Sequence, residues 1–112
     1  MNRTAALEAL ATISLPIPEA ISCLANFPWD CETELVQLNQ EHFRNVLLQF
    51  EQGVLSAVEV EGWANALECR DDVGFATSLL RELLHELANP LLTQPLSGER
   101  ANFWLSQLQH VR

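Results

Sequence analysis

Apolar residues recur along the chain mainly at the three- and four-residue spacing of amphipathic helices. Two of these helices have clear start signals, because Asn39 and Ser56 are residues that cap helix N-termini. Ser56 and Glu59 also form the Ser-x-x-Glu pattern of a capping box, and Gly53 stands where a glycine ends the first helix. The pattern predicts one helix from about 40 to 52 and another from about 57 to 70. Their expected core positions are Phe43, Val46, Leu47, Phe50, Val60, Trp63, Ala64 and Leu67.

Four more helices are expected before and after this pair. A short helix over residues 4–13 stops before Pro16, and Pro18 stands in the first turn of the next. A leucine-rich helix follows, capped by Asp71 or Asp72, and Ser97 caps a last helix. The expected core positions are Leu7, Leu10, Ala11, Ile21, Leu24, Ala25, Leu79, Leu80, Leu83, Leu84, Leu87, Ala101, Trp104, Leu105, Leu108 and Val111.

The segment from about 26 to 38 lacks helical spacing. Residues 34–38 alternate partly between polar and apolar, which suits one short strand or an extended linker, and no partner strand is apparent. The predicted fold class is therefore all-α, an irregular bundle of five to six short helices with one short extended segment near 32–38. We expect one helical domain over 1–112.

The excess of acidic residues limits the kinds of partner that the chain can bind. Fifteen acidic residues against six arginines and no lysine give a net charge of -9, which repels phosphate backbones and anionic headgroups. We therefore expect no nucleic-acid or membrane partner. Glu8 interrupts the apolar run that a signal peptide would need, and the three cysteines lack paired spacing. These features predict a cytoplasmic protein whose cysteines act as small buried hydrophobes.

The densest polar cluster lies in and after the Trp63 helix. Steps of 100° per residue place four side chains on one face opposite the core, namely Glu61, Asn65, Glu68 and Asp72. This face is interpreted as the contact for a basic partner or, through Glu68 and Asp72, for a divalent cation. The alternative is a solvated face with an N-cap aspartate. Arg70 is expected to clamp the helix end, stacked on Trp63 or paired with an aspartate.

Enzymatic chemistry has little support. Glu68-Cys69-Arg70-Asp71 resembles the Glu-x-x-Asp half of the metal site in small all-α nucleotide pyrophosphohydrolases, but the Glu-x-x-Glu half has no counterpart. This resemblance implies a metal-dependent hydrolase as the alternative function. His42, His85 and His110 lack zinc-ligand spacing. We assign no catalytic residue, no cofactor and no metal site.

Two aromatic residues stand outside the expected core stripes. Phe103 lies on the far side of the last helix from its core row, where it is an exposed anchor for a partner or packs on the N-terminal segment. Trp29 lies in a turn, where it either plugs the core or marks an interface.

Residues 40–100 resemble an uncharacterised group of small bacterial all-α proteins. The signatures are Trp63-Ala64-Asn65, Arg70-Asp71-Asp72 and Ala88-Asn89-Pro90. The resemblance implies bacterial origin and a common architecture, and it brings no established activity. Together with the acidic surface, it favours a non-catalytic protein-interaction module, immunity-like or adaptor, that binds a basic protein partner. A homo-oligomer is also compatible with the sequence.

Overall fold

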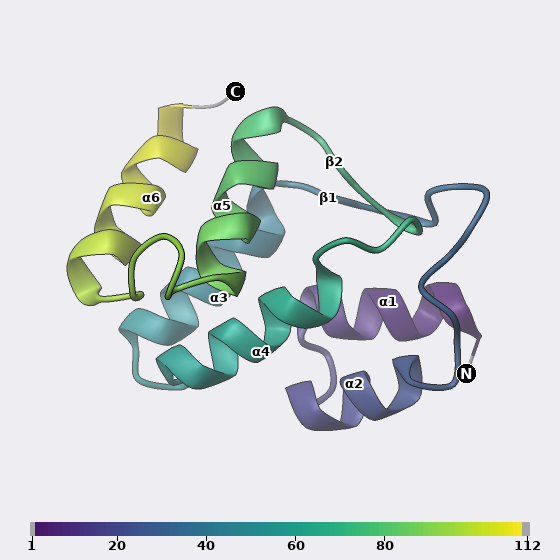
Figure 1. Cartoon of the computed structure of the whole chain (residues 1–112). Coiled ribbons are helices and arrows are strands. Elements are labelled where there is room, and N and C mark those ends of the chain that lie inside the picture. The colour runs from purple at the N-terminus through teal and green to yellow at the C-terminus, as the bar shows by residue number, and fades with distance from the viewer. Residues whose placement is uncertain (1, 111–112) are drawn as a thin grey trace.

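The computed structural model describes residues 2–110. For Gln109 and His110 it describes the backbone but not the side chains. This part of the chain forms six helices and a two-stranded sheet (Figure 1), which confirms the predicted all-α class. The helices are α1 (Arg3–Thr12), α2 (Ile17–Leu24), α3 (Gln40–Glu51), α4 (Ala57–Leu67), α5 (Ser78–Ala88) and α6 (Gly98–His110). The strands are β1 (Val36–Leu38) and β2 (Val73–Phe75).

The helix starts follow from local capping chemistry. The Ser56 side chain accepts a hydrogen bond from the Glu59 amide, and the Glu59 carboxylate accepts one from the Ser56 amide, which completes the predicted capping box. Asn39 caps α3 in the same way, but here His42 supplies the reciprocal acceptor through Nδ1 at 3.0 Å. Ser97 caps α6 by accepting a hydrogen bond from the Arg100 amide. These three predicted starts are confirmed.

The extended segment has a partner that its sequence does not reveal. β1 pairs in parallel with β2, with Val36 opposite Val73 and Leu38 opposite Phe75. The expectation of a lone strand was therefore wrong. Because β2 lies between the Asp71-Asp72 turn and α5, neither aspartate caps α5, and Thr77 does so instead.

The core centres on Trp63, which is completely buried. Its indole N–H donates to the carbonyl oxygen of Leu10 at 2.8 Å, and its ring meets that of Phe43 edge-on at 5.5 Å between centroids. One side chain therefore joins α4 to α1 and α3. Figure 1 shows α1 and α2 side by side at one end of the molecule and α6 at the other.

Most predicted core positions are buried. Those that are only partly buried are Ile21, Phe50, Leu79 and Leu105. Ala25 is exposed, which contradicts its predicted burial, and Val111 lies outside the described residues. Cys69 is also exposed, while Cys23 and Cys31 are partly buried, so the expectation of three buried thiols was wrong.

Within residues 2–110, no helix combines the length and the apolar character that crossing a membrane requires.

Candidate functional site

The helix that carries the predicted acidic face is shorter than its sequence pattern suggests. α4 ends at Leu67, Glu68 is already extended with ψ 142°, and Cys69 takes the left-handed conformation with φ 65°. The 100° steps that placed Asp72 beside Glu61 and Asn65 therefore do not apply beyond residue 67. The prediction that four polar side chains share one helical face was wrong, because only Glu61 and Asn65 lie on the helix.

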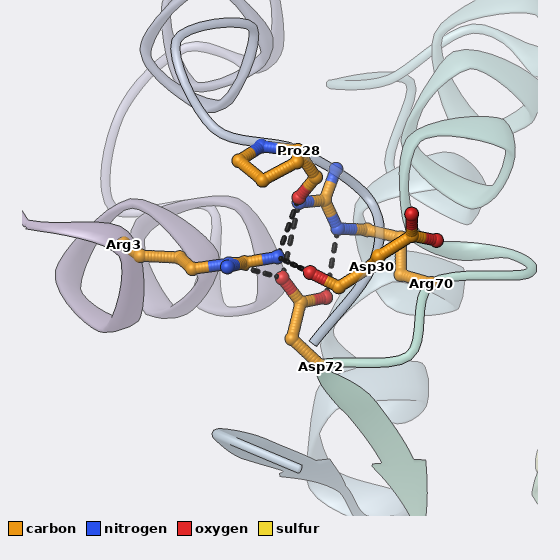
Figure 2. Close-up of polar contacts among 5 residues, drawn as sticks. All are labelled: Arg3, Pro28, Asp30, Arg70 and Asp72. Atoms are coloured by element: carbon orange, nitrogen blue, oxygen red, sulfur yellow. Dashed lines mark hydrogen bonds and ion pairs between the residues drawn. The ribbon is translucent and has the colours of Figure 1, made fainter. Parts of the chain in front are cut away.

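Asp72 is instead the centre of a buried ionic cluster. Its side chain is completely buried, and Figure 2 shows arginines from two directions on its carboxylate. Arg70 donates from Nε to Oδ1 at 2.9 Å and from Nη2 to Oδ2 at 3.1 Å. Arg3, from the first turn of α1, donates from Nε to Oδ2 at 2.8 Å. The Asp72 carboxylate is thus fully paired and presents no surface to a partner.

The two arginines also hold the loop that follows α2. Arg3 and Arg70 both donate through Nη2 to the carbonyl oxygen of Pro28, and Arg3 donates to that of Asp30 at 2.7 Å (Figure 2). We call Arg3, Arg70 and Asp72 the ionic staple. It joins three segments that are distant in the sequence, namely the α1 start, the 26–31 loop and the α4–β2 turn.

The staple also sets the protonation state of Asp72. Burial raises the pKa of this carboxyl, but the hydrogen bonds and positive charges of Arg70 and Arg3 outweigh burial, so the net pKa lies below the ordinary value of 3.8. Asp72 is therefore an anion at neutral pH.

Arg70 clamps the end of α4 through its pair with Asp72, which confirms one of its two predicted arrangements, and it also lies against a tryptophan. Its guanidinium carbon lies 4.8 Å from the ring centroid of Trp29, and the neighbouring Asp71 amide donates to the Trp29 carbonyl oxygen at 3.2 Å. Stacking on Trp63 was the wrong expectation, because Trp63 points into the core and Arg70 follows the end of the helix. Trp29 remains 48% exposed, so it does not plug the core.

An open groove lies beside Trp29, between α2 and α4. It encloses about 570 Å³. Its lining is largely apolar and consists of Ile21, Leu24, Ala25, Phe27, Trp29, Gly62, Asn65, Ala66 and Arg70. Gly62, Asn65 and Ala66 form the α4 wall, so the predicted contact residue Asn65 faces this groove. We call it the α2–α4 groove.

Glu68 belongs to a separate contact between the α4 end and α5. Asn89 donates from Nδ2 to both Glu68 carboxylate oxygens, at 2.9 and 3.2 Å, and His85 Nδ1 lies 3.0 Å from Glu68 Oε2. Glu68 and Asp71 do not share a helical turn, since α4 has already ended. Among the described residues, no group of three histidine, cysteine, aspartate or glutamate side chains is arranged to hold a metal ion.

Phe103 is exposed, as one of its two interpretations requires. It lies on α6, and 43% of its surface is accessible. The Arg100 guanidinium carbon lies 4.4 Å from its ring centroid, and the centroid of the Trp104 ring lies 5.3 Å from it. Arg100 and Trp104 both donate to the Glu86 carboxylate, which fixes α6 against α5. Phe103 does not line the α2–α4 groove, and α6 and α2 lie at different ends of the molecule (Figure 1), so the predicted contact residues do not form one surface.

Sequence reasoning missed two residues of this site. Arg3 has no local pattern that marks it, because its partner lies 69 positions away. Gly62 did have a signal, since a glycine inside a helical pattern costs about 1 kcal/mol relative to alanine and is an unusual residue there.

No protein-family model matches the chain, and neither a curated protein nor a solved structure matches it.

Proposed function

We propose that the protein is a non-catalytic interaction module that binds a basic segment of a partner protein in the α2–α4 groove. The observation that carries the proposal is the groove itself, an open and largely apolar hollow of about 570 Å³ with a half-exposed tryptophan at its edge. Apolar hollows with tryptophan or arginine anchors are typical of the strongest contacts in protein interfaces.

Charge indicates the kind of partner. Asp30 and Asp71 adjoin Trp29 at the groove edge, whereas the predicted contact residue Glu61 lines a different cleft, between α4 and the loop after α5. None of the ion pairs found within residues 2–110 involves Asp30 or Asp71. They are therefore available to lysine or arginine side chains, and the net charge of -9 attracts a basic partner over longer distances.

Gly62 provides a second argument for a close contact in the groove. A Cβ at this position would meet nothing within 4 Å, so packing within the chain does not require glycine there. Glycine inside a helix costs roughly 0.5–1 kcal/mol relative to alanine. Its effect at the groove wall is to expose the helix backbone, which allows a partner segment to approach closely.

The groove edge is also ordered before any partner binds. The ionic staple fixes the loop through the Pro28 and Asp30 carbonyl oxygens, and the Arg70 guanidinium lies against the Trp29 ring. A pre-organised anchor loses less conformational entropy on association than a mobile one. An immunity protein that neutralises a basic nuclease, or an adaptor that holds a basic segment, would benefit from such a surface.

Capture from a bacterial lysate with three baits tests the proposal. The baits are the wild-type chain, Gly62→Arg, which fills the groove and adds a positive charge, and Phe103→Ala, which alters the other exposed aromatic residue. A Cβ at position 62 would meet nothing within 4 Å, and arginine is a better helix former than glycine, so Gly62→Arg should melt at or slightly above the wild-type temperature. The expected result is a basic protein captured by wild type and by Phe103→Ala but not by Gly62→Arg, with less capture at high salt.

Two outcomes contradict the proposal. If Gly62→Arg captured the partner as well as the wild-type chain does, the groove would not be part of the interface. Capture lost only in Phe103→Ala would move the contact to α6.

A further inference from the structure

A second hollow adjoins the first half of α4, whereas the α2–α4 groove adjoins the second half. It lies where the loop after α5 passes the start of α4 (Figure 1), and it encloses about 250 Å³. Val58 and Glu61 line it from α4, and Leu91 and Pro95 line it from the loop. Among the described residues that line it, Glu61 alone is charged and the others are apolar. We call this hollow the Glu61 cleft.

The Glu61 carboxylate has no partner among residues 2–110. No ion pair or side-chain hydrogen bond found there involves it, although the residue is partly buried. A lysine or arginine side chain fits such a position, because its apolar stem packs on the walls of the cleft while its charge meets the carboxylate. The cleft therefore favours a cation that a partner supplies.

The outer face of α4 connects the two hollows. Steps of 100° per residue place Val58, Glu61, Gly62 and Asn65 within an arc of about 100°, opposite the buried stripe of this helix. Val58 and Glu61 line the cleft, and Gly62 and Asn65 line the groove. Because Gly62 carries no side chain, a partner segment can lie directly on the helix backbone as it passes from one hollow to the other.

We infer that one segment of the proposed basic partner occupies both hollows, crossing α4 at Gly62 and pairing a lysine or arginine with Glu61. The inference rests on the proposed function and adds a second binding point to the α2–α4 groove. Charge complementarity selects the occupant, because Asp30 and Asp71 beside the groove and Glu61 in the cleft are in none of the ion pairs found within residues 2–110.

A second copy of the chain is a poor source of this cation. The sequence contains no lysine, and the acidic surfaces of two copies repel each other. Four of the arginines within residues 2–110 already pair with carboxylates of their own chain, namely Arg3, Arg44, Arg70 and Arg100.

Helix geometry sets the spacing of the anchors on the partner. A rise of about 1.5 Å per residue separates Val58 from Asn65 by about 10 Å along α4. An extended segment covers about 3.3 Å per residue, so its apolar side chain in the groove and its apolar side chain in the cleft should be about three to four positions apart. The basic residue that pairs with Glu61 should stand beside the second of them.

A phage-displayed library of random linear peptides, selected on the full wild-type chain, tests this inference. The affinity of each enriched peptide is then measured by fluorescence anisotropy. We expect the enriched sequences to share two apolar positions about three to four residues apart, with a lysine or arginine next to one of them.

Three full-chain variants separate the two hollows. Ala25→Arg blocks the groove from the α2 side and leaves the cleft unchanged. Glu61→Lys reverses the charge in the cleft, and Glu51→Lys, at the exposed end of α3, makes the same change in net charge away from both hollows. Melting temperatures should stay close to that of wild type, because the replaced side chains lie outside the core and in none of the ion pairs found within residues 2–110.

We expect Ala25→Arg and Glu61→Lys each to weaken peptide binding by about 10-fold or more, and Glu51→Lys by less than about threefold. Replacing the basic residue of the peptide by glutamine should reduce the effect of Glu61→Lys to that of Glu51→Lys. Equal binding by Glu61→Lys and Glu51→Lys, with loss in Ala25→Arg, would overturn the inference and leave the proposed function standing. Binding unaffected by Ala25→Arg, or a library without an enriched peptide, would overturn both.

Discussion

Arg3 and Asp72 are separated by 69 positions in the chain, and their side chains meet at 2.8 Å in a buried ion pair. With Arg70 they bring the N-terminal helix, the Trp29 loop and the turn after α4 to one point (Figure 2). The candidate groove has its edge at this point, so the fold and the proposed binding surface depend on the same three side chains.

Replacing the central carboxylate should be strongly destabilising. Asp72→Asn keeps the size of the side chain but leaves two arginines without their counter-charge, so we expect the free energy of unfolding to fall by about 3–5 kcal/mol. Urea denaturation measures this change. The control is Glu41→Gln, which breaks the exposed pair with Arg44 and should change stability by less than about 1 kcal/mol. Similar small losses for both variants would show that the staple contributes little.

The contribution of Asp72 should disappear in acid. Its pKa is below 3.8 in the folded protein, so the unfolded chain binds the proton more readily. The stabilisation is fully present above about pH 3.8 and is lost as the pH falls through the lower, folded-state pKa. The difference in unfolding free energy between wild type and Asp72→Asn should therefore shrink below pH 3.8. A difference that stays constant down to pH 2 would contradict this account.

A second pH effect should come from the α3 cap. Burial lowers the pKa of His42 from 6.5, while the negative charge of Glu8 partly offsets this by raising it. The neutral ring is the form that accepts the Asn39 amide hydrogen bond through Nδ1. Because the unfolded chain binds the proton more readily, the stabilisation is complete above about pH 6.5 and decreases as the pH falls below it.

His42→Gln provides the comparison for this effect. Glutamine is a normal acceptor at this position of a capping box and does not titrate. The unfolding free energy of the variant should depend less on pH than that of wild type between pH 6.5 and pH 5. Parallel pH profiles would show that His42 is not the group responsible.

Two glycines should respond to alanine in opposite directions. Gly62 is helical with free space around it, so Gly62→Ala should raise the unfolding free energy by about 0.5–1 kcal/mol. Gly53 follows α3 with φ +78°, a left-handed conformation that strains alanine, so Gly53→Ala should lower it by about 1–2 kcal/mol. Thermal or urea unfolding of both variants checks the signs. A destabilised Gly62→Ala would mean that the fold itself needs the glycine.

The helices could be predicted because their signals are local. Asn39, Ser56 and Ser97 act on amides two or three residues away, and the apolar spacing that follows each cap lies within one helix. The buried face of α4 was correct at all four predicted positions for the same reason.

The turn after α4 could not be predicted in this way. The left-handed Cys69 ends the helical spacing, and β2 exists because β1 lies beside it, from a distant part of the sequence. Asp72 therefore looked like the next polar residue of a helix, although Arg3 and Arg70 bury it. Trp29 and Asn65 were recognised as candidates, but the groove between them depends on how α2 packs against α4.

Photo-crosslinking from two positions tests the central claim most directly. A photoreactive amino acid replaces either Asn65 in the α2–α4 groove or Phe103 on α6, and crosslinked peptides are identified by mass spectrometry after exposure to lysate. We expect a specific crosslink from position 65, to a partner segment rich in lysine and arginine, and none from position 103. A partner crosslinked only from position 103, or an acidic segment crosslinked from position 65, would contradict the proposal that the groove binds a basic partner.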